Sequence, residues 1–502
     1  MSLLKSVLWF LDVRTALLCL VLFLVLRWFF GRSKDLPPGP VGLPIIGSIL
    51  AIHREMRQGI EPHNLFIKYA AKYGPVFRLN ILNKTVVVLN DYSSVKEAFQ
   101  HPQLNDRPKM LLSDVLKSDG VSFASGKPWI ELRRFCLTVL RSFGVGKTSF
   151  EEKIGEEAEE LMKEMSDFNG KPFDPKPLLG NAVSNVICNV IFGKRYKYAD
   201  EEFTRLLALL ARNFKLLGAG AVVNFFPILR HLPSVPTAEM MSNFEEIRVF
   251  VTSIIDSHRD IFDVNDPKDF TDCFLKEVKQ NEAKDAMGVQ HGFLSERNFA
   301  GTIIALFGAG TETTATTLQW ALLYMTVYPE IQRRVQAEID SVVGRNRLPR
   351  MADKQELNFT RAVIWEVQRL SLIVPLGVAH AAASDTQFRN FTIPKDALLV
   401  PNLWAVAHDP NVWPEPDQFK PERFLNDKGE AVKADELIPF SVGRRSCIGE
   451  HLAKMELVIF FSYFMHQFTF KKPDNSPPLS LKGRGGFNYS PLSFEICAIN
   501  RE

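Results

Sequence analysis

Cysteine is scarce in this chain, with six in 502 residues, and no two of them form a CxxC pair. Zinc sites and thioredoxin-like centres are commonly built on such pairs, so the sequence argues against both. A fold stabilised by disulfides needs a far higher cysteine density. Five of the six cysteines therefore fit buried or free thiols in a reducing compartment, whereas Cys447 lies in an unusual segment between glycines.

The chain also lacks a large excess of charge of either sign. It carries 60 basic and 57 acidic side chains, for a net charge of +3. Nucleic-acid-binding domains usually show a strongly basic face, so no nucleic-acid partner is expected, although the balance leaves room for a local basic patch. Because apolar residues make up 46% of the chain and charged residues 23%, it can bury a large core and is not disordered.

An apolar run without charge occupies Ala16–Leu26. As a helix, Thr15–Phe30 would be ~24 Å long, slightly short of a ~30 Å hydrocarbon core. The aromatic residues beside Arg27 suit the membrane interface. A cleaved signal peptide is the main alternative, but no small-residue cleavage motif follows. We therefore predict an uncleaved single-pass anchor within residues 1–30, and the flanking basic residues weakly favour a cytosolic body.

Residues 31–50 are predicted to form a proline-rich hinge. Proline restricts φ and lacks an N–H donor, so this stretch reads as a stiff spacer. No later linker or repeat is apparent, and residues 51–502 are predicted to form one large domain. Its pattern is mainly α with small β-sheets. The predicted helices are Glu151–Glu164, Phe203–Leu217, Phe244–Phe262, Ser295–Tyr328, Pro329–Val343, Thr360–Leu370 and Gly449–Phe468. The predicted strands are Val76–Leu82, Thr85–Leu89 and Ala397–Leu403.

Cys447 belongs to the segment Phe440–Gly449, which reads FSVGRRSCIG and directly precedes a helical pattern. A thiolate stays ionised where positive charge and donors surround it, and a helix N-terminus supplies both. Gly443 permits a turn, and Gly449 leaves room for a flat cofactor. A buried cysteine before a helix is the ordinary alternative, but the surrounding pattern outweighs it. The segment resembles the haem-binding signature of the cytochrome P450 family, in which the cysteine binds the iron.

A second pattern places Glu366 and Arg369 three residues apart on a predicted helix, where they can pair on one face. Alone this spacing is weak, because such ion pairs are usually solvated. Arg423, in the downstream sequence PERF, strengthens it. Together the three residues resemble the Glu-Arg-Arg triad of the P450 family, which implies a structural network behind the haem rather than a catalytic group.

A third pattern, Ala309–Thr314, reads AGTETT inside a long apolar helix pattern. Glycine costs up to ~1 kcal/mol in a helix interior, and consecutive threonines are also poor helix formers, so ordinary helix packing leaves this composition unexplained. We interpret it as a local opening, where Gly310 admits ligand or oxygen and Glu312 and Thr313 organise water and protons. The segment resembles the oxygen-activation motif of the family, so these two residues are the predicted catalytic pair.

Trp129 and Arg133 are four residues apart on a further predicted helix and can face one anion, although an ordinary surface helix is the alternative. In P450s this W-x-x-x-R pattern meets a haem propionate. Arg445 and His380 occupy further positions that commonly do so. The resemblance therefore implies that these four residues, together with Phe440 and the Cys447 ligand, bind haem b.

The resemblance extends from the proline hinge to the C-terminus. Segments such as KPFDPK, NAVSNVIC and TLQWALLYM are similar to the microsomal family-two P450s, and within that group to the subfamily that oxidises arachidonate-like fatty acids. It implies the largely helical P450 fold with a small β-sheet lobe, behind an N-terminal anchor helix. It also implies an endoplasmic reticulum membrane protein whose catalytic domain faces the cytosol.

The implied reaction inserts one oxygen atom from O2 into an apolar fatty acid, steroid or xenobiotic, with two electrons from NADPH. An axial thiolate favours cleavage of the O–O bond. The implied partners are membrane lipid, NADPH-cytochrome P450 reductase and cytochrome b5. The acidic docking face of the reductase would suit a basic patch to which Arg134, Arg141 and Arg444 contribute.

The residues implied to line the substrate pocket are Gly308, Ala309, Val374 and Phe487. The chain departs from many relatives at three positions: Ile130 replaces a lysine, Ala305 an acidic residue, and Gly308 a bulky aromatic one. The last two changes lie on the helix over the haem, and Gly308 favours a larger pocket.

Two other functions compete with this reading. A haem-thiolate isomerase rearranges peroxides without a reductase, but that class tends to lose the acid–alcohol pair, which is present here as Glu312 and Thr313. A non-catalytic haem protein that binds gas or lipid would have no use for a proton-delivery motif. A requirement for NADPH and reductase distinguishes the monooxygenase from both.

Overall fold

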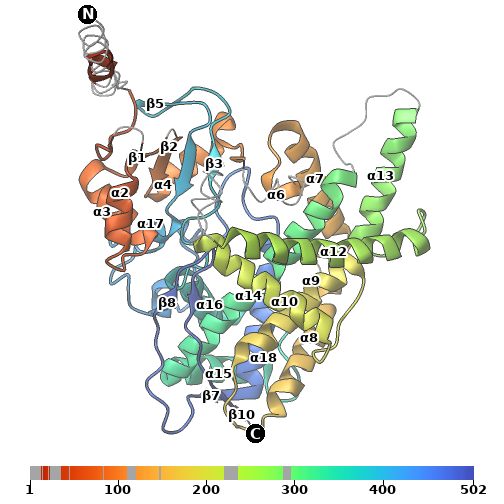
Figure 1. The fold of residues 1–502 in the computed structure, drawn as a ribbon. Coiled ribbons are helices and arrows are strands. Elements are labelled where there is room, and N and C mark those ends of the chain that lie inside the picture. Colours follow the sequence, from red (N-terminus) through yellow and green to blue (C-terminus); the bar gives the residue numbers. More distant parts are fainter. Residues whose placement is uncertain are drawn as a thin grey trace, which may run out of the picture.

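The computed structural model describes residues 13, 15–20, 22, 35–43, 46–82, 84–109, 120–145, 148–219, 236–286 and 296–501. Long helices and short strands make up this part of the chain, so the predicted class, mainly α with small β-sheets, is confirmed (Figure 1).

The helices are α2 (Ile49–Met56), α3 (Pro62–Tyr73), α4 (Tyr92–Gln100), α6 (Gly120–Phe123), α7 (Gly126–Ser142), α8 (Thr148–Ser166), α9 (Pro175–Phe192), α10 (Glu201–Ala219), α12 (Thr237–Ile261), α13 (Phe270–Ala286), α14 (Glu296–Val327), α15 (Pro329–Val343), α16 (Asn358–Leu370), α17 (Leu403–Ala407) and α18 (Glu450–Gln467). Short 3₁₀ helices are η1 (Pro102–Leu104), η3 (Asp353–Gln355) and η4 (Pro421–Phe424). The strands are β1 (Val76–Ile81), β2 (Lys84–Leu89), β3 (His380–Ala381), β4 (Thr386–Phe388), β5 (Phe391–Ile393), β6 (Leu398–Pro401), β7 (Phe468–Lys471), β8 (Gly483–Arg484), β9 (Ser490–Pro491) and β10 (Cys497–Asn500).

A four-stranded sheet with the order β1-β2-β6-β3 forms a small lobe together with α2, α3, α4 and α17 (Figure 1). β1 and β2 pair as an antiparallel hairpin, with Val76 opposite Leu89. β6, from much later in the chain, pairs parallel to β2, and β3 then pairs antiparallel to β6. Val87 and Leu399 are fully buried between this sheet and the adjoining helices. The β3 residue His380 is thereby held close to the helical core.

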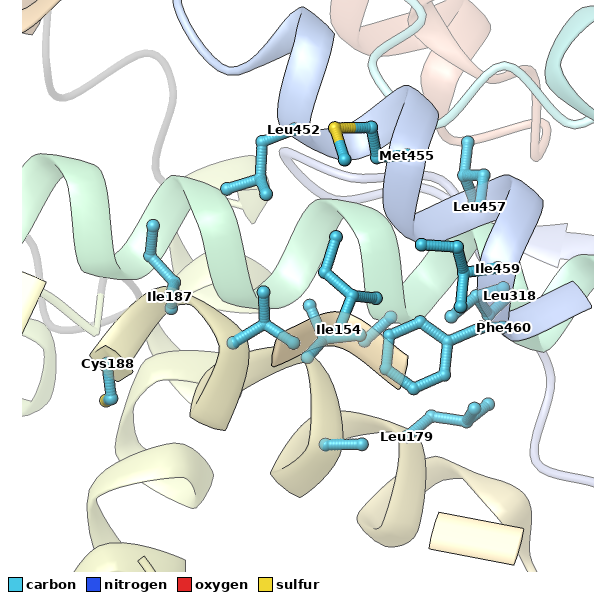
Figure 2. Packing of buried hydrophobic residues seen from close by; sticks show 14 of the residues in the cluster. Ile154, Leu179, Ile187, Cys188, Leu318, Leu452, Met455, Leu457, Ile459 and Phe460 are labelled. Carbon is cyan, nitrogen blue, oxygen red and sulfur yellow. The ribbon is translucent and has the colours of Figure 1, made fainter. Parts of the chain in front are cut away.

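The helical lobe is organised around α14, the longest helix described, which packs against α9 along one side and against α16 and α18 along another. Figure 2 shows Ile187 of α9 and Leu318 of α14 in the same buried cluster as Leu452 and Met455 of α18. All are apolar and nearly inaccessible to water. Burial of apolar surface is the main favourable term in folding, so this cluster holds α14 and α18 together.

Helix boundaries follow local signals closely. The predicted helix Pro329–Val343 is α15 without change, because proline suits a first helical turn and Gly344 ends the helix at φ 76°. The strand predicted over Ala397–Leu403 is shorter: β6 ends at Pro401 and Leu403 begins α17. The cause is Asn402, whose side chain accepts a hydrogen bond from the backbone N–H of Ala405 and caps the helix.

The membrane anchor predicted within residues 1–30 falls largely outside the described residues. Among those that are described, no helix combines the length and apolar character needed to span a bilayer. The following proline-rich segment lies against β1: the N–H of Arg78 donates to the Pro38 carbonyl at 2.7 Å, and Gly47 bridges to Ile81. This segment is therefore joined to the sheet by backbone contacts.

Candidate active site

Cys447 lies in the loop that enters α18. Its backbone N–H donates to the Phe440 carbonyl at 3.0 Å, which closes the loop into a tight turn. Gly443 has φ +80°, and a Cβ there would lie 2.3 Å from the carbonyl oxygen of Phe99. Both the conformation and the close approach require glycine, as the sequence predicted.

Cys447 is exposed, although burial still affects the pKa of its thiol. Burial raises the pKa of the thiol, whereas backbone hydrogen bonds from Gly449 and Glu450 and the charge of Arg133 act to lower it. Exposure and a pKa raised by burial occur together when a group faces a hollow inside the protein rather than the outer surface. A Cβ at Gly449 would meet only this sulfur, at 3.9 Å, so the adjoining side of the loop is open.

Ala309, in the middle of α14, is exposed in the same way although Phe307 and Gly308 before it are buried. A helix at the centre of the fold exposes such a residue only where it borders an interior hollow. A thiol with donors around it, open space beside Gly449 and the exposed Ala309 of α14 together fit a flat, iron-containing cofactor.

Three arginines gather near Cys447. Arg445 is 7% exposed, and its guanidinium lies 3.9 Å from the ring centroid of Trp129. It donates to the carbonyls of Asn105 and Ala124 at 2.8 and 2.7 Å. Burial and then the nearby Arg107 are the main causes that lower the pKa of Arg445 to about 8. Arg133 donates to the Ser446 hydroxyl at 3.4 Å.

Arg107 is a member of this group that the sequence did not reveal. It donates to the carbonyls of Val378 and Ala379 at 2.8 and 2.9 Å, directly before His380. Burial and the charge of Arg133 lower its pKa to about 9. Burial is the largest cause of these lowered pKa values, and neighbouring arginines lower those of Arg107 and Arg445 further. An anionic ligand would relieve this concentration of positive charge. A ligand with two carboxylates, such as haem, matches that requirement.

His380 is almost fully buried, stacks on the Phe99 ring at 3.7 Å between centroids, and places Nδ1 2.9 Å from the Leu104 carbonyl. That contact requires a proton on Nδ1 and leaves Nε2 to interact with a ligand. Burial, then the charge of Arg107, holds the pKa of His380 well below its usual range. The predicted cofactor residues from α7, β3 and the cysteine loop therefore converge.

Glu366 and Arg369 form a fully buried, two-pronged ion pair with distances of 2.7 and 2.8 Å. Arg423 donates to the same carboxylate at 3.0 Å, and so does the backbone N–H of Lys420, at 2.9 Å. Arg369 also donates to the carbonyl of Pro416. The triad thus joins α16 to η4 and the segment that leads to the cysteine loop, as expected of a structural network.

The predicted catalytic pair lies on α14. The Thr313 hydroxyl donates to the Ala309 carbonyl at 2.7 Å, so its proton is engaged and its lone pairs remain to accept. Burial raises the pKa of Glu312, and the charge of Lys176 partly opposes this effect. Glu312 therefore keeps its proton to a higher pH than an exposed glutamate would.

The role expected for Gly310 is wrong. A Cβ at this position would lie 2.9 Å from Cγ1 of Ile187 on α9, so the glycine permits close packing of two helices instead of admitting a ligand. The neighbouring hydrogen bond between Ser184 and Thr311, at 3.2 Å, belongs to the same helix contact. The exposed surface of α14 is at Ala309, one residue earlier.

Two of the predicted pocket residues, Gly308 and Phe487, lie against α10. A Cβ at Gly308 would make ordinary contacts with Leu210 and Phe214, at 3.6 and 3.8 Å. The ring of Phe487 lies 5.7 Å from that of Phe214, and its N–H donates to the Phe214 carbonyl. The fourth residue, Val374, is partly buried.

The cytochrome P450 family model matches residues 37–498. The chain belongs to the cytochrome P450 family. It is 41% identical to cytochrome P450 2J3 of Rattus norvegicus, an alignment that covers 100% of this chain and 99% of that protein. Cytochrome P450 2J2 of Homo sapiens is 40% identical (97% and 96% covered), and cytochrome P450 2U1 of Bos taurus is 38% identical (97% and 94%).

The resemblance to family-two P450s is thereby confirmed. This P450 is a haem monooxygenase whose cofactor is haem b, held by a cysteine thiolate. Arg134, Arg141 and Arg444 are exposed, as a docking patch requires.

A second group of ligand-type side chains in the P450 has a structural explanation. His258, Asp269 and Asp272 lie within reach of one cation. Asp269 accepts from the N–H of Asp272, and Asp272 accepts from the N–H of Lys268, a reciprocal cap at the start of α13. His258 pairs with Asp269 at 2.9 Å. The carboxylate oxygens of Asp269 and Asp272 therefore already have hydrogen-bond partners in the connection between α12 and α13.

Proposed function

We propose that this P450 inserts one oxygen atom from O2 into apolar substrates, fatty acids first among them and steroids and xenobiotics as further candidates, with NADPH electrons delivered by the flavoprotein P450 reductase. The acid–alcohol pair beside the exposed Ala309 is the observation that carries the proposal. A peroxide isomerase or a gas-binding haem protein needs no such pair. The exposed arginines of α7 and the cysteine loop support docking of an acidic reductase, with cytochrome b5 as a second candidate.

In this proposal Cys447 is the thiolate ligand. Arg107, Arg133 and Arg445 bind the two carboxylates of haem, assisted by His380 and by the Trp129 ring. Haem with a thiolate ligand supplies the activation of O2. The protein contributes positive charge, exclusion of water and placement of proton donors. Because the Thr313 hydroxyl donates to its own helix, it would serve a bound group as a hydrogen-bond acceptor.

Glu312 supplies the proton in this arrangement. Its carboxyl group is partly accessible on α14, and burial makes the protonated form more persistent at neutral pH. Thr313, as a hydrogen-bond acceptor, holds a protonated group in place beside Glu312. A positioned proton transfer of this kind typically contributes a factor of ~10²–10⁴ in rate.

The proposal is tested by reconstituting the full-length protein with P450 reductase, NADPH and a pool of fatty acids, steroids and drugs under ¹⁸O2. We expect products that gain one labelled atom, only when NADPH and reductase are both present. Products that form without reductase would support the isomerase, and absence of any product across the pool would support a binding protein.

Replacing Thr313 by alanine should uncouple the reaction. We expect haem content, substrate binding and NADPH consumption to persist while product falls and hydrogen peroxide rises, because the acceptor beside Glu312 is lost. Thr317→Ala is the matched control: Thr317 makes the same type of bond to the carbonyl four residues earlier, at 3.0 Å. An unchanged yield of product per NADPH in Thr313→Ala would show that Thr313 only packs.

We also propose that residues 1–30 anchor the protein in the endoplasmic reticulum membrane, with the catalytic domain in the cytosol. Removing them should shift much of the protein to the soluble fraction without loss of haem. Some attachment should remain, because Val41, Leu43 and Leu50 expose apolar side chains. A truncated protein that fails to hold haem would show instead that this segment is part of the fold.

A further inference from the structure

Glu456 is a buried acid that the proposed mechanism does not use. It lies in the middle of α18, is 2% exposed, and has the apolar neighbours Met455 and Leu457 along the chain. Figure 2 shows both neighbours among the buried apolar residues of the cluster to which α14 and α18 contribute. An ionised carboxylate in such surroundings is unfavourable unless it is paired.

Unlike Glu366, Glu456 has no ion-pair partner in the described part of the chain. Glu366 is equally buried but is bound by two arginines and a backbone N–H. Glu456 accepts one hydrogen bond, from the Thr314 hydroxyl to Oε2 at 3.1 Å. Its Oε1 has no partner within the described part of the chain. Burial, which the bond from Thr314 only partly opposes, raises the pKa of Glu456 to about 8.

The position of this hydrogen bond gives it a role. Thr314 directly follows the Glu312–Thr313 pair on α14, and it is itself buried. Glu456 lies on α18, whose first residue, Glu450, is three positions after Cys447. Apolar contacts between two helices are non-directional, whereas a hydrogen bond has a preferred length and angle. The bond therefore defines how α14 sits along α18.

We propose that Glu456, as a neutral carboxylic acid, is a positioning residue that sets the Glu312–Thr313 pair relative to Cys447 through its hydrogen bond with Thr314. The inference rests on the proposed monooxygenase function and adds a residue to it. Glu456 does not touch substrate or cofactor in this account. It acts through Thr314 alone, so the two side chains should respond to substitution as a unit.

Four variants separate the possibilities. Glu456→Gln keeps the shape and the acceptor without a titratable proton, whereas Glu456→Leu and Thr314→Val remove one partner each. Thr326→Val is the matched control, because Thr326 is a buried threonine of α14 that bonds to the Leu322 carbonyl of its own helix. Product per NADPH is measured for each from pH 6.5 to 9.5, with haem content and thermal unfolding alongside.

We expect Glu456→Leu and Thr314→Val to lower product per NADPH about fivefold at pH 7, the effect of losing one net hydrogen bond, while Thr326→Val stays near wild type. The wild type should lose coupling as the pH rises through about 8, because the ionised carboxylate is an unpaired charge in the apolar contact between α14 and α18, even though Thr314 still donates to it. Glu456→Gln should keep neutral-pH coupling and lack this alkaline decline. Equal coupling in Thr314→Val and wild type, or an alkaline decline that survives in Glu456→Gln, would overturn the proposal.

Two readouts are independent of turnover. The difference spectrum between wild type and Glu456→Gln should show, at pH 7, an infrared carbonyl band of a protonated carboxyl that disappears between pH 7 and 9. In the unfolded chain Glu456 ionises near 4.5, so its contribution to stability is fully present below that pH and is lost as the pH rises to about 8. Glu456→Gln should remove that part of the pH dependence of thermal unfolding.

These measurements distinguish failure of the inference from failure of the proposed function. If the wild type forms no product with NADPH and reductase, the function is wrong, and the infrared and unfolding arms still report the state of Glu456. If product forms but wild type and Glu456→Gln show the same protonated-carboxyl band at pH 7, Glu456 is ionised and the inference is wrong.

Discussion

Replacing Glu366 by alanine should yield protein that does not hold haem stably. The substitution leaves Arg369, which is fully buried, and Arg423, which is 7% exposed, without their shared carboxylate. Removing one partner of a buried ion pair typically costs ~3–5 kcal/mol. The net stability of a folded domain is only ~5–15 kcal/mol, so a large share would be lost. We expect a low haem-to-protein ratio and a lower unfolding temperature.

Glu422→Ala is the matched control for this prediction. Glu422 lies in the same η4 segment and pairs with Arg334 at 2.5 Å, but both side chains are about half exposed. An exposed pair is worth ~0–1 kcal/mol, so haem content should be retained. A Glu366→Ala protein that is well folded and haem-loaded but slow in turnover would make Glu366 a catalytic residue and contradict the structural assignment.

The features that the sequence predicted well share one property: their geometry is local. The turn at Gly443, the α15 boundaries and the spacing of Glu366 and Arg369 depend on neighbours within a few residues. The same holds for Thr313, whose hydroxyl donates to the carbonyl of Ala309, four residues earlier in its own helix. Residues a few positions apart in the sequence are also close in space, so their spacing predicts these contacts directly.

The features that it missed depend on contacts between distant segments. Gly310 faces Ile187 from a different helix, and a single sequence gives no sign of that contact. Arg107 follows no motif, and its role appears only because β3 brings His380 beside it. Glu456 lies in an apolar stretch where a lone acid has no local partner. Each required the three-dimensional arrangement.

The helix α9 was missed for a related reason. Its residues are apolar on nearly every face, because it is buried between α8 and α14. A helix that is buried all round lacks the apolar and polar alternation by which a helix is recognised in a sequence. The strand predicted over Ala397–Leu403 ran into the first residue of the short helix α17, because the cap at Asn402 directly follows the strand residues that end at Pro401.

Cys447→Ser should abolish the thiolate-type spectrum of the reduced carbonyl complex and, with it, turnover. Serine is a much weaker donor to iron, and the donors and positive charge around position 447 are suited to a thiolate. Serine is close to cysteine in size, so the loop with its Gly443 turn should persist. Among the other cysteines, Cys273→Ser and Cys497→Ser, both only partly buried, are the controls and should keep the signal.

The reduced carbonyl spectrum of Cys447→Ser beside these two controls is the most direct test that the haem of this P450 is held by the Cys447 thiolate. We predict that the thiolate-type band is present in wild type, Cys273→Ser and Cys497→Ser and absent from Cys447→Ser. A Cys447→Ser protein that retains both the band and turnover would contradict the ligand assignment and the site built around it.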